Sequence, residues 1–132
     1  IAKPIPLEDA KVTIVLDMMS SHVLLKAERE ALRDEILRIL KSGGWLFFKS
    51  FLLDEDRNAE RMLRESPGPE EGMYLHPEIG VPEYVWTMEA IEEFYGPYFT
   101  IHKFEKSFKH VRASGAAWKR RTVSAYLQKI SK

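Results

Sequence analysis

A short polar segment with proton-exchanging and hydrogen-bonding side chains follows an apolar run near the start of the sequence. The run KVTIVLD ends at Asp17, and Ser20, Ser21 and His22 come within the next five residues. A histidine exchanges protons near neutral pH because its unperturbed pKa is about 6.5, so His22 is a candidate general base or substrate-orienting group. Ser20 and Ser21 are candidates to bind the substrate. The structural alternative has Asp17 and the serines capping the turn or the next helix, with His22 packed against the loop.

A second apolar run, Trp45–Phe48, is followed by Lys49 and Ser50. If both runs are neighbouring parallel strands, the polar residues after them lie at the same edge of the sheet, where α/β proteins bind ligands. Lys49 and Ser50 are therefore candidates to line a substrate pocket. The alternative places Lys49 at the solvent end of its strand.

An aromatic segment rich in glycine and proline covers residues 67–87 and carries Tyr74, His76 and Trp86. A loop of this length without regular structure is usually functional or mobile. Aromatic side chains on such a loop suit a lid over an apolar or planar substrate. The alternative is a satellite hydrophobic cluster that holds the loop in place.

Several kinds of site are excluded by what the sequence lacks. There is no cysteine, which removes disulfides, thiolate metal sites and cysteine nucleophiles. The histidines show no metal-ligand spacing with carboxylates, and there is no G-x-S-x-G motif and no phosphate-binding loop. No apolar run approaches the ~18 residues of a membrane span, and residues 1–11 lack the apolar core of a signal peptide. We therefore expect a cytoplasmic location and no metal site.

Charge is balanced overall, with 20 basic and 20 acidic residues, but it is segregated along the chain. Residues 54–93 are mostly acidic, whereas residues 103–132 carry nearly all their charge on lysine and arginine. Such asymmetry can mark a nucleic-acid surface. Because the chain has no net charge, we expect instead that the two segments complement each other in the fold or form solvated faces.

Hydrophobic periodicity predicts a chain that alternates strands and helices. The first run is mostly β-branched and nearly unbroken, which is typical of a strand buried on both faces, and the second run is similar. Between Val23 and Lys41 the apolar period is helical, and Gly43 or Gly44 supplies a left-handed residue that ends the helix. The later elements are a helix at 54–66, a helix capped by Thr87 at 88–96, a strand at 98–111 with a bulge after Ile101, a flexible connector at 112–120 and a strand at 121–129.

The order of these elements predicts the fold class. A helix joins the first two strands, so we expect them to be parallel with a right-handed crossover. The last two strands are close in sequence, which indicates an antiparallel pair. The chain is therefore expected to form one α/β domain, a three-layer sandwich with its ligands beyond the carboxyl ends of the parallel strands.

Two stretches carry a resemblance to a known family. PLEDAKVTIVLDMMSSHVL and LKSGGWLFF resemble the fourth strand and the L-K-P-G-G-x-L hallmark before the fifth strand of class I S-adenosylmethionine-dependent methyltransferases, with Ser42 replacing the usual proline. The terminal YFTIHKFEKSF and RRTVSAYLQK are similar to the sixth and seventh strands of that family. The resemblance covers nearly the whole chain and is nearest to the small-molecule, type 11-like members. It implies a Rossmann-like sheet in which the seventh strand lies between the fifth and sixth.

The resemblance also implies site residues and a missing part. Asp17 and Met18 stand where the family places residues that face the cofactor. The position of Asp17 is also one where the family often places a residue that faces the methyl group or the substrate. The family's glycine-rich turn and acidic ribose-binding residue have no counterpart in this sequence. Residues 1–132 are therefore expected to form the carboxyl-terminal, substrate-side half of a methyltransferase domain. The first strand, Lys11–Leu16, would then be an exposed edge that pairs with another copy or a partner chain.

Three functions are compatible with this resemblance. The first is methyl transfer from S-adenosylmethionine to a small-molecule acceptor, which the neutral overall charge favours. The second is methylation of RNA held by the basic segment from Lys103 to Arg121. The third is a non-catalytic subunit that pairs with a separate cofactor-binding chain. We expect residues 1–132 alone to bind the cofactor weakly and to be inactive.

Overall fold

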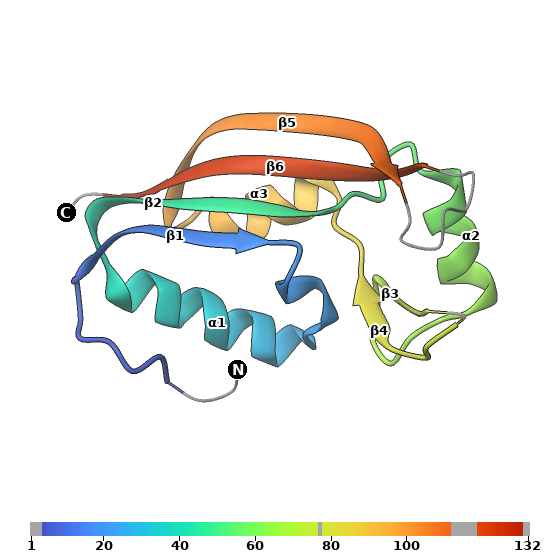
Figure 1. Cartoon of the computed structure of the whole chain (residues 1–132), viewed down its shortest axis with the longest axis horizontal. Helices are drawn as coiled ribbons and strands as arrows, with labels where there is room; N and C mark the ends of the chain where they lie inside the picture. The colour runs from blue at the N-terminus through green and yellow to red at the C-terminus, as the bar shows by residue number, and fades with distance from the viewer. Residues whose placement is uncertain (1–3, 77, 112–118, 131–132) are drawn as a thin grey trace.

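The computed structural model describes residues 4–76, 78–111 and 119–130. Figure 1 shows one long sheet with α1 and α3 beside it and the small β3–β4 hairpin at one end. No helix among the described residues is long and apolar enough to cross a membrane. The elements are, in chain order, β1 (Val12–Met18), the 3₁₀ turn η1 (Ser21–Val23), α1 (Lys26–Ile39), β2 (Leu40–Phe51), α2 (Arg57–Glu65), β3 (Met73–Leu75), β4 (Pro82–Tyr84), α3 (Met88–Tyr95), β5 (Phe99–Val111) and β6 (Lys119–Lys129).

The long sheet has the strand order β1-β2-β6-β5. β1 and β2 are parallel, and β6 is antiparallel to both of its neighbours. The predicted Rossmann-like α/β topology is confirmed. The last strand of the chain, β6, lies between β2 and β5, and β1 is an edge of the described sheet. The bulge predicted after Ile101 is present as a register shift between Ile101 and Lys103. Of the predicted connector, residues 112–118 lie outside the described part of the chain.

α1 and α3 cover the same face of the sheet. Phe48 of β2 is fully buried there and packs against Trp86 and Tyr95, with ring centroids 5.4 and 5.3 Å apart. The guanidinium of Arg33 in α1 lies over the ring of Phe94 in α3, 4.4 Å from its centroid, so the two helices touch. Burying an aromatic side chain of this size contributes about 2 kcal/mol or more, and this layer is therefore the main core.

The opposite face of the sheet has no helix over it among the described residues. Ile14, Leu16 and Met18 of β1 point to that face and are 51%, 65% and 45% exposed. Trp45 and Phe47 of β2 share it, half-buried and stacked on each other. The prediction that these strands are buried on both faces is wrong for the described residues, because a strand face is buried only where another layer covers it.

The paired glycines act inside β2 rather than at the end of α1. The C-cap residue of α1, Leu40, is already extended. Gly43 has φ 78°, which glycine adopts without strain, and it lies where the register between β1 and β2 shifts. A Cβ on Gly44 would stand 2.9 Å from the Lys41 carbonyl oxygen and 3.1 Å from that of Thr13. The predicted glycine cap is therefore wrong, and the two glycines instead form an irregularity that brings the strands close together.

The glycine- and proline-rich segment 67–87 is more regular than predicted. It contains β3 and β4, which pair antiparallel with Tyr74 opposite Glu83. Gly72 and Gly80, both with positive φ, supply backbone conformations that the hairpin needs. Strands of three residues are too short to show a period, so the pattern predicted an irregular loop.

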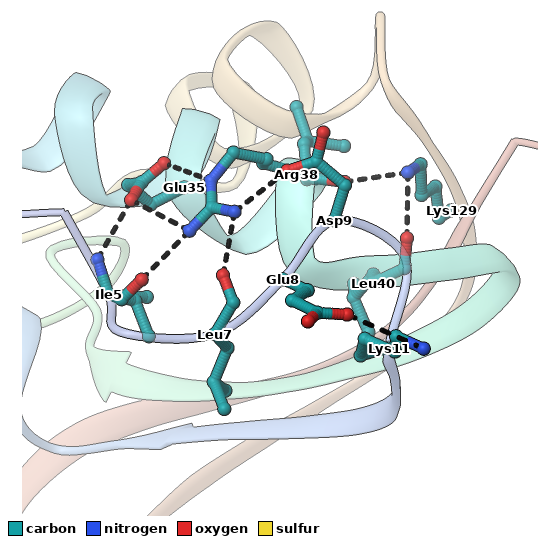
Figure 2. Close-up of polar contacts among 10 residues, drawn as sticks. Ile5, Leu7, Glu8, Asp9, Lys11, Glu35, Arg38, Leu40 and Lys129 are labelled. Atoms are coloured by element: carbon teal, nitrogen blue, oxygen red, sulfur yellow. Dashed lines mark hydrogen bonds and ion pairs between the residues drawn. The ribbon is translucent and has the colours of Figure 1, made fainter.

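The segment before β1 is tied to α1 by Arg38 (Figure 2). The guanidinium donates hydrogen bonds to the backbone oxygens of Ile5 and Leu7, at 2.9 and 2.8 Å, and to the Asp9 carboxylate at 2.8 Å. Glu35 completes this arrangement, because its carboxylate accepts from both Arg38 and the Ile5 amide. These contacts fix the path of the chain into β1, whose carboxyl end carries the candidate site.

Candidate functional site

The two parallel strands end side by side. Asp17 is in register with Phe48, and Met18 is in register with Lys49. Beyond the ladder, the Met19 amide donates to the Lys49 carbonyl oxygen at 2.8 Å. The structure therefore brings Asp17, Met18 and Lys49 to the same end of the sheet, as the sequence predicted. The prediction that Lys49 and Ser50 follow the second strand is wrong, because β2 continues through them to Phe51.

Both oxygens of the Asp17 carboxylate are occupied by serine hydroxyls. Ser20 Oγ donates to Oδ1 and Ser21 Oγ donates to Oδ2, each at 2.6 Å, and Asp17 is only 4% exposed. The contacts span the tight turn in which Met19 adopts a φ of 57°. Capping of the turn, which is the structural alternative for Asp17, thus accounts for its observed contacts. The serines do not cap α1, whose N-cap residue is Leu25, because Asp17 uses their hydroxyls.

A buried polar cluster, here called the Glu83 cluster, lies beside this turn and consists of His22, Tyr74, Glu83 and Arg120. Glu83 Oε1 accepts a hydrogen bond from the Tyr74 hydroxyl at 2.6 Å and from Arg120 Nη1 at 3.2 Å. His22 Nε2 lies 3.8 Å from the other carboxylate oxygen. The Arg120 guanidinium also lies 3.4 Å from the centroid of the Phe51 ring. The cluster therefore joins the turn after β1, the β3–β4 hairpin and the start of β6.

Glu83 and Arg120 were not among the predicted site residues. They stand 37 positions apart and belong to no motif, so the only signal was the segregation of charge along the chain. In the fold, acidic and basic segments meet at this pair and again at Arg121 and Glu55, 3.7 Å apart. Lys129 Nζ donates to two backbone oxygens near the end of α1, at 2.6 and 2.8 Å. The expected complementarity of the two segments holds for the two ion pairs, whereas Lys129 contacts a part of the chain outside the acidic segment.

The surroundings of His22 favour its neutral form. Its side chain is 12% exposed and packs edge-on against Phe51, with ring centroids 5.2 Å apart. Burial lowers the pKa of His22 below its ordinary value, and Arg120 lowers it further, against the opposing effect of Glu83 and Asp17. Nδ1 is buried and has no hydrogen-bond partner within the described residues. A neutral imidazole is the form that accepts a proton, so the site suits general-base chemistry.

The lowered pKa of His22 predicts a pH-dependent stability. As the pH falls below 6.5, the unfolded chain takes up a proton at His22, whereas the folded chain does so only at lower pH. The free energy of unfolding should therefore decrease between about pH 7 and about pH 5, and His22→Gln should make this decrease smaller. Urea denaturation across this range measures the difference, with His76→Gln as the control. An unchanged pH dependence in His22→Gln would contradict the lowered pKa.

The remaining predicted residues do not gather into one lid. Tyr74 and Trp86 are each 2% exposed and lie in two different hydrophobic clusters, so the packing alternative describes both. His76 is half-buried in the hairpin, where its Nδ1 accepts from the Glu78 amide at 3.3 Å. Ser50 is 1% exposed, and its Oγ has no partner among the residues that the structure describes.

Comparison with known proteins gives structural matches only. No family profile and no curated protein matches the chain. A SAM-dependent methyltransferase of Methanosarcina mazei shares 18% identity over 99% of this chain, with a TM-score of 0.84. The 1,6-didemethyltoxoflavin-N1-methyltransferase of Burkholderia thailandensis, solved with S-adenosylhomocysteine, shares 12% identity over 94%, with a TM-score of 0.65. A Haloferax volcanii complex between the Trm112 methyltransferase activator and its proposed methyltransferase matches with 14% identity over 99% and a TM-score of 0.65.

This chain spans less than two thirds of each of these three proteins: 65%, 46% and 59% of their lengths. At identities this low, the structural matches are evidence for a common fold and for nothing finer. The parallel pair β1–β2 and the antiparallel β6 inserted beside β2 are the topology that the sequence resemblance implied. The described residues therefore have the α/β fold of the class I S-adenosylmethionine-dependent methyltransferases.

Proposed function

We propose that residues 1–132 form the substrate-side half of a methyltransferase that transfers the methyl group of S-adenosylmethionine to a small-molecule acceptor. The observation that carries this proposal is the strand order, in which parallel β1 and β2 end side by side and β6 follows antiparallel. In sheets of this kind, ligands bind beyond the carboxyl ends of the parallel strands. The similarity to the Methanosarcina mazei and Burkholderia thailandensis methyltransferases supports the same type of reaction.

The described residues fit one wall of a cofactor site. Met18 is 45% exposed at the end of β1, beside the buried Asp17, so a ligand can approach the strand end from the open face of the sheet. Among the described elements, no glycine opens a helix directly after a strand. We therefore assign Asp17 and Met18 to the cofactor side of the site and assign the glycine-rich half to another segment or chain.

When bound, S-adenosylmethionine would supply a methyl group on a sulfonium: the acceptor would bond to the methyl carbon, and S-adenosylhomocysteine would leave with the electron pair of the broken carbon–sulfur bond. The chain's own residues would orient the acceptor, exclude water and take up a proton where the acceptor carries one. His22 is our candidate for the base that takes up this proton, and its contacts with the other members of the Glu83 cluster hold its ring in place. Asp17 fixes the turn at the strand end, and Lys49 and Ser50, near the carboxyl end of β2, would lie on the acceptor side.

The exposed edge strand supports a proposal about pairing. Ile14, Leu16 and Met18 leave an apolar surface along β1, and an open strand edge of this kind favours contact with another chain. We propose that the glycine-rich half covers this surface and that a second copy of the chain covers it when that half is absent. Light scattering after gel filtration should then show dimers of the 132-residue chain, and a monomer at high concentration would contradict this pairing.

A labelling experiment tests the reaction and its acceptor class. The complete natural polypeptide that contains residues 1–132 is incubated with methyl-labelled S-adenosylmethionine and, in parallel, with a small-molecule extract or with RNA. We expect label in the small-molecule fraction, because two cations of the basic segment are already paired within the chain: Arg120 with Glu83 and Arg121 with Glu55. Label in RNA alone would mean that the acceptor is RNA and not a small molecule. Label in neither fraction, with the cofactor bound, would favour the non-catalytic subunit.

A further inference from the structure

A second hollow lies away from the strand ends, between α1, the β3–β4 hairpin and α3. Its volume is about 730 Å³, which is within the usual size of small-molecule sites. Successive residues of β4 point to opposite sides, so Glu83 belongs to the Glu83 cluster while Tyr84 lines this cavity. Neither Asp17 nor His22 contributes to its walls. The cavity is therefore separate from the proposed methyl-transfer site.

Aromatic rings form one part of the cavity wall. Tyr84 and Phe94 each stand edge-on to Trp86, with ring centroids 4.8 and 5.3 Å from it. Trp86 is 2% exposed, and its Nε1–H has no acceptor among the residues that the structure describes. A buried N–H without an acceptor costs free energy, and an oxygen atom of a ligand that displaces the side chains covering it would satisfy it.

A buried cation lies next to these rings. The Arg29 side chain is 6% exposed, and its guanidinium carbon lies 3.8 Å from the centroid of the Tyr84 ring. Nη1 donates to the Leu24 carbonyl oxygen at 2.6 Å. Within the described ranges no carboxylate comes within 4.0 Å of the guanidinium, so its charge has no counter-ion in direct contact. Buried charges are normally paired, and Arg29 is therefore a place for an anionic group.

The rim of the same cavity carries the opposite charge. Glu71, at the start of the hairpin, and Glu93, on α3, are exposed and make no ion pair among the described residues. Glu30 of α1 and Glu70 add two more carboxylates to the lining, which also contains Lys26 and Arg33. An ammonium group seated above an aromatic wall and beside carboxylates would be stabilised by both. The cavity thus combines the buried cation Arg29 with a lining in which four carboxylates outnumber the other two cations, Lys26 and Arg33.

We propose that this cavity binds a zwitterionic small molecule with a planar apolar body, such as an aromatic amino acid. The anionic end would meet Arg29 and the Trp86 Nε1–H, the ring would pack between Tyr84 and Phe94, and the ammonium would face Glu71 and Glu93. This site would act in addition to the proposed methyl-transfer site, and its ligand need not be the acceptor.

Three probes that each carry a benzene ring test whether the ligand needs both the anionic and the cationic group. Calorimetric titration of the folded chain compares L-phenylalanine with 2-phenylethylamine, which lacks the anion, and with 3-phenylpropionate, which lacks the cation. We expect the amino acid to bind at least about tenfold more tightly than either analogue, because each analogue leaves one charged wall without a partner. No saturable heat with any probe, or an analogue that binds as tightly as the amino acid, would overturn the proposal.

Matched variants locate the site. Glu93→Gln removes a rim charge from an exposed position and should weaken L-phenylalanine binding several-fold while leaving 3-phenylpropionate unaffected. Glu89→Gln, an exposed carboxylate on the same helix outside the cavity, should change neither affinity. Arg29→Gln should abolish the preference for the amino acid over the amine, in protein shown by circular dichroism to be folded. Unchanged binding in both Glu93→Gln and Arg29→Gln would place the ligand elsewhere and overturn the assignment.

Discussion

Replacing Glu83 with glutamine should lower the free energy of unfolding by about 3 kcal/mol or more, because it leaves a buried guanidinium without its counter-charge. Glu83 and Arg120 are 8% and 7% exposed, and Arg120 Nη1 lies 3.2 Å from Glu83 Oε1. The change also turns the acceptor of the Tyr74 hydroxyl from a charged into a neutral group, which weakens that hydrogen bond. Urea denaturation followed by circular dichroism measures the loss.

Two further variants show whether the loss comes from the buried pair. Glu78→Gln removes an exposed carboxylate from the same hairpin and should change the stability by less than about 0.5 kcal/mol. The double variant Glu83→Gln with Arg120→Met removes both charges and should be more stable than Glu83→Gln alone. A loss below about 1 kcal/mol in the single variant, or no recovery in the double variant, would show that the ion pair does not stabilise the fold.

Replacing Asp17 with alanine should cost about 2–4 kcal/mol of stability, because two serine hydroxyls lose a charged acceptor. Ser21 is 5% exposed, so its hydroxyl cannot turn to water without a rearrangement of the turn. The turn after β1 should then open and displace His22, which follows directly. Denaturation with urea again gives the size of the effect, and hydrogen exchange at residues 19–22 shows where the turn opens.

A double-mutant cycle isolates the hydrogen bond between Asp17 and Ser21. Ser21→Ala should cost about 1 kcal/mol in the natural chain and close to nothing once Asp17 is alanine. Additive losses would show that the hydroxyl and the carboxylate stabilise the fold independently.

For the reaction, Asp17→Asn keeps the shape of the side chain, and we expect it to slow methyl transfer by the complete polypeptide about 100-fold by misplacing the strand end.

The sequence predicted the elements with strong local patterns. The apolar run up to Asp17, the helical period that follows it and the second run from Trp45 are enough to predict two parallel strands joined by a helix. The antiparallel terminal pair was predictable because its two strands are close in the sequence. The same patterns placed Asp17 and Lys49 at one edge, because parallel strands end together.

Other features depend on contacts that no local pattern records. Glu83 and Arg120 become partners only when the hairpin folds against the start of β6, so spacing gave no hint of them. The three-residue strands of the hairpin were hidden by their glycines and prolines. Ile14 and Leu16 have the composition of a fully buried strand but face an uncovered side of the sheet, since composition does not report which layers are present.

Calorimetric titration with S-adenosylmethionine tests the central claim most directly, namely that residues 1–132 supply the acceptor side of a methyl-transfer site and that its glycine-rich half lies elsewhere. S-adenosylhomocysteine, the ligand held by the Burkholderia thailandensis enzyme, serves as the second probe. We predict micromolar binding by the natural protein together with the segment or partner chain that carries the glycine-rich half, and no saturable heat with the 132-residue chain. Tight binding by the short chain would show that it already holds the whole cofactor site, and an absence of binding in both proteins would contradict a methyltransferase.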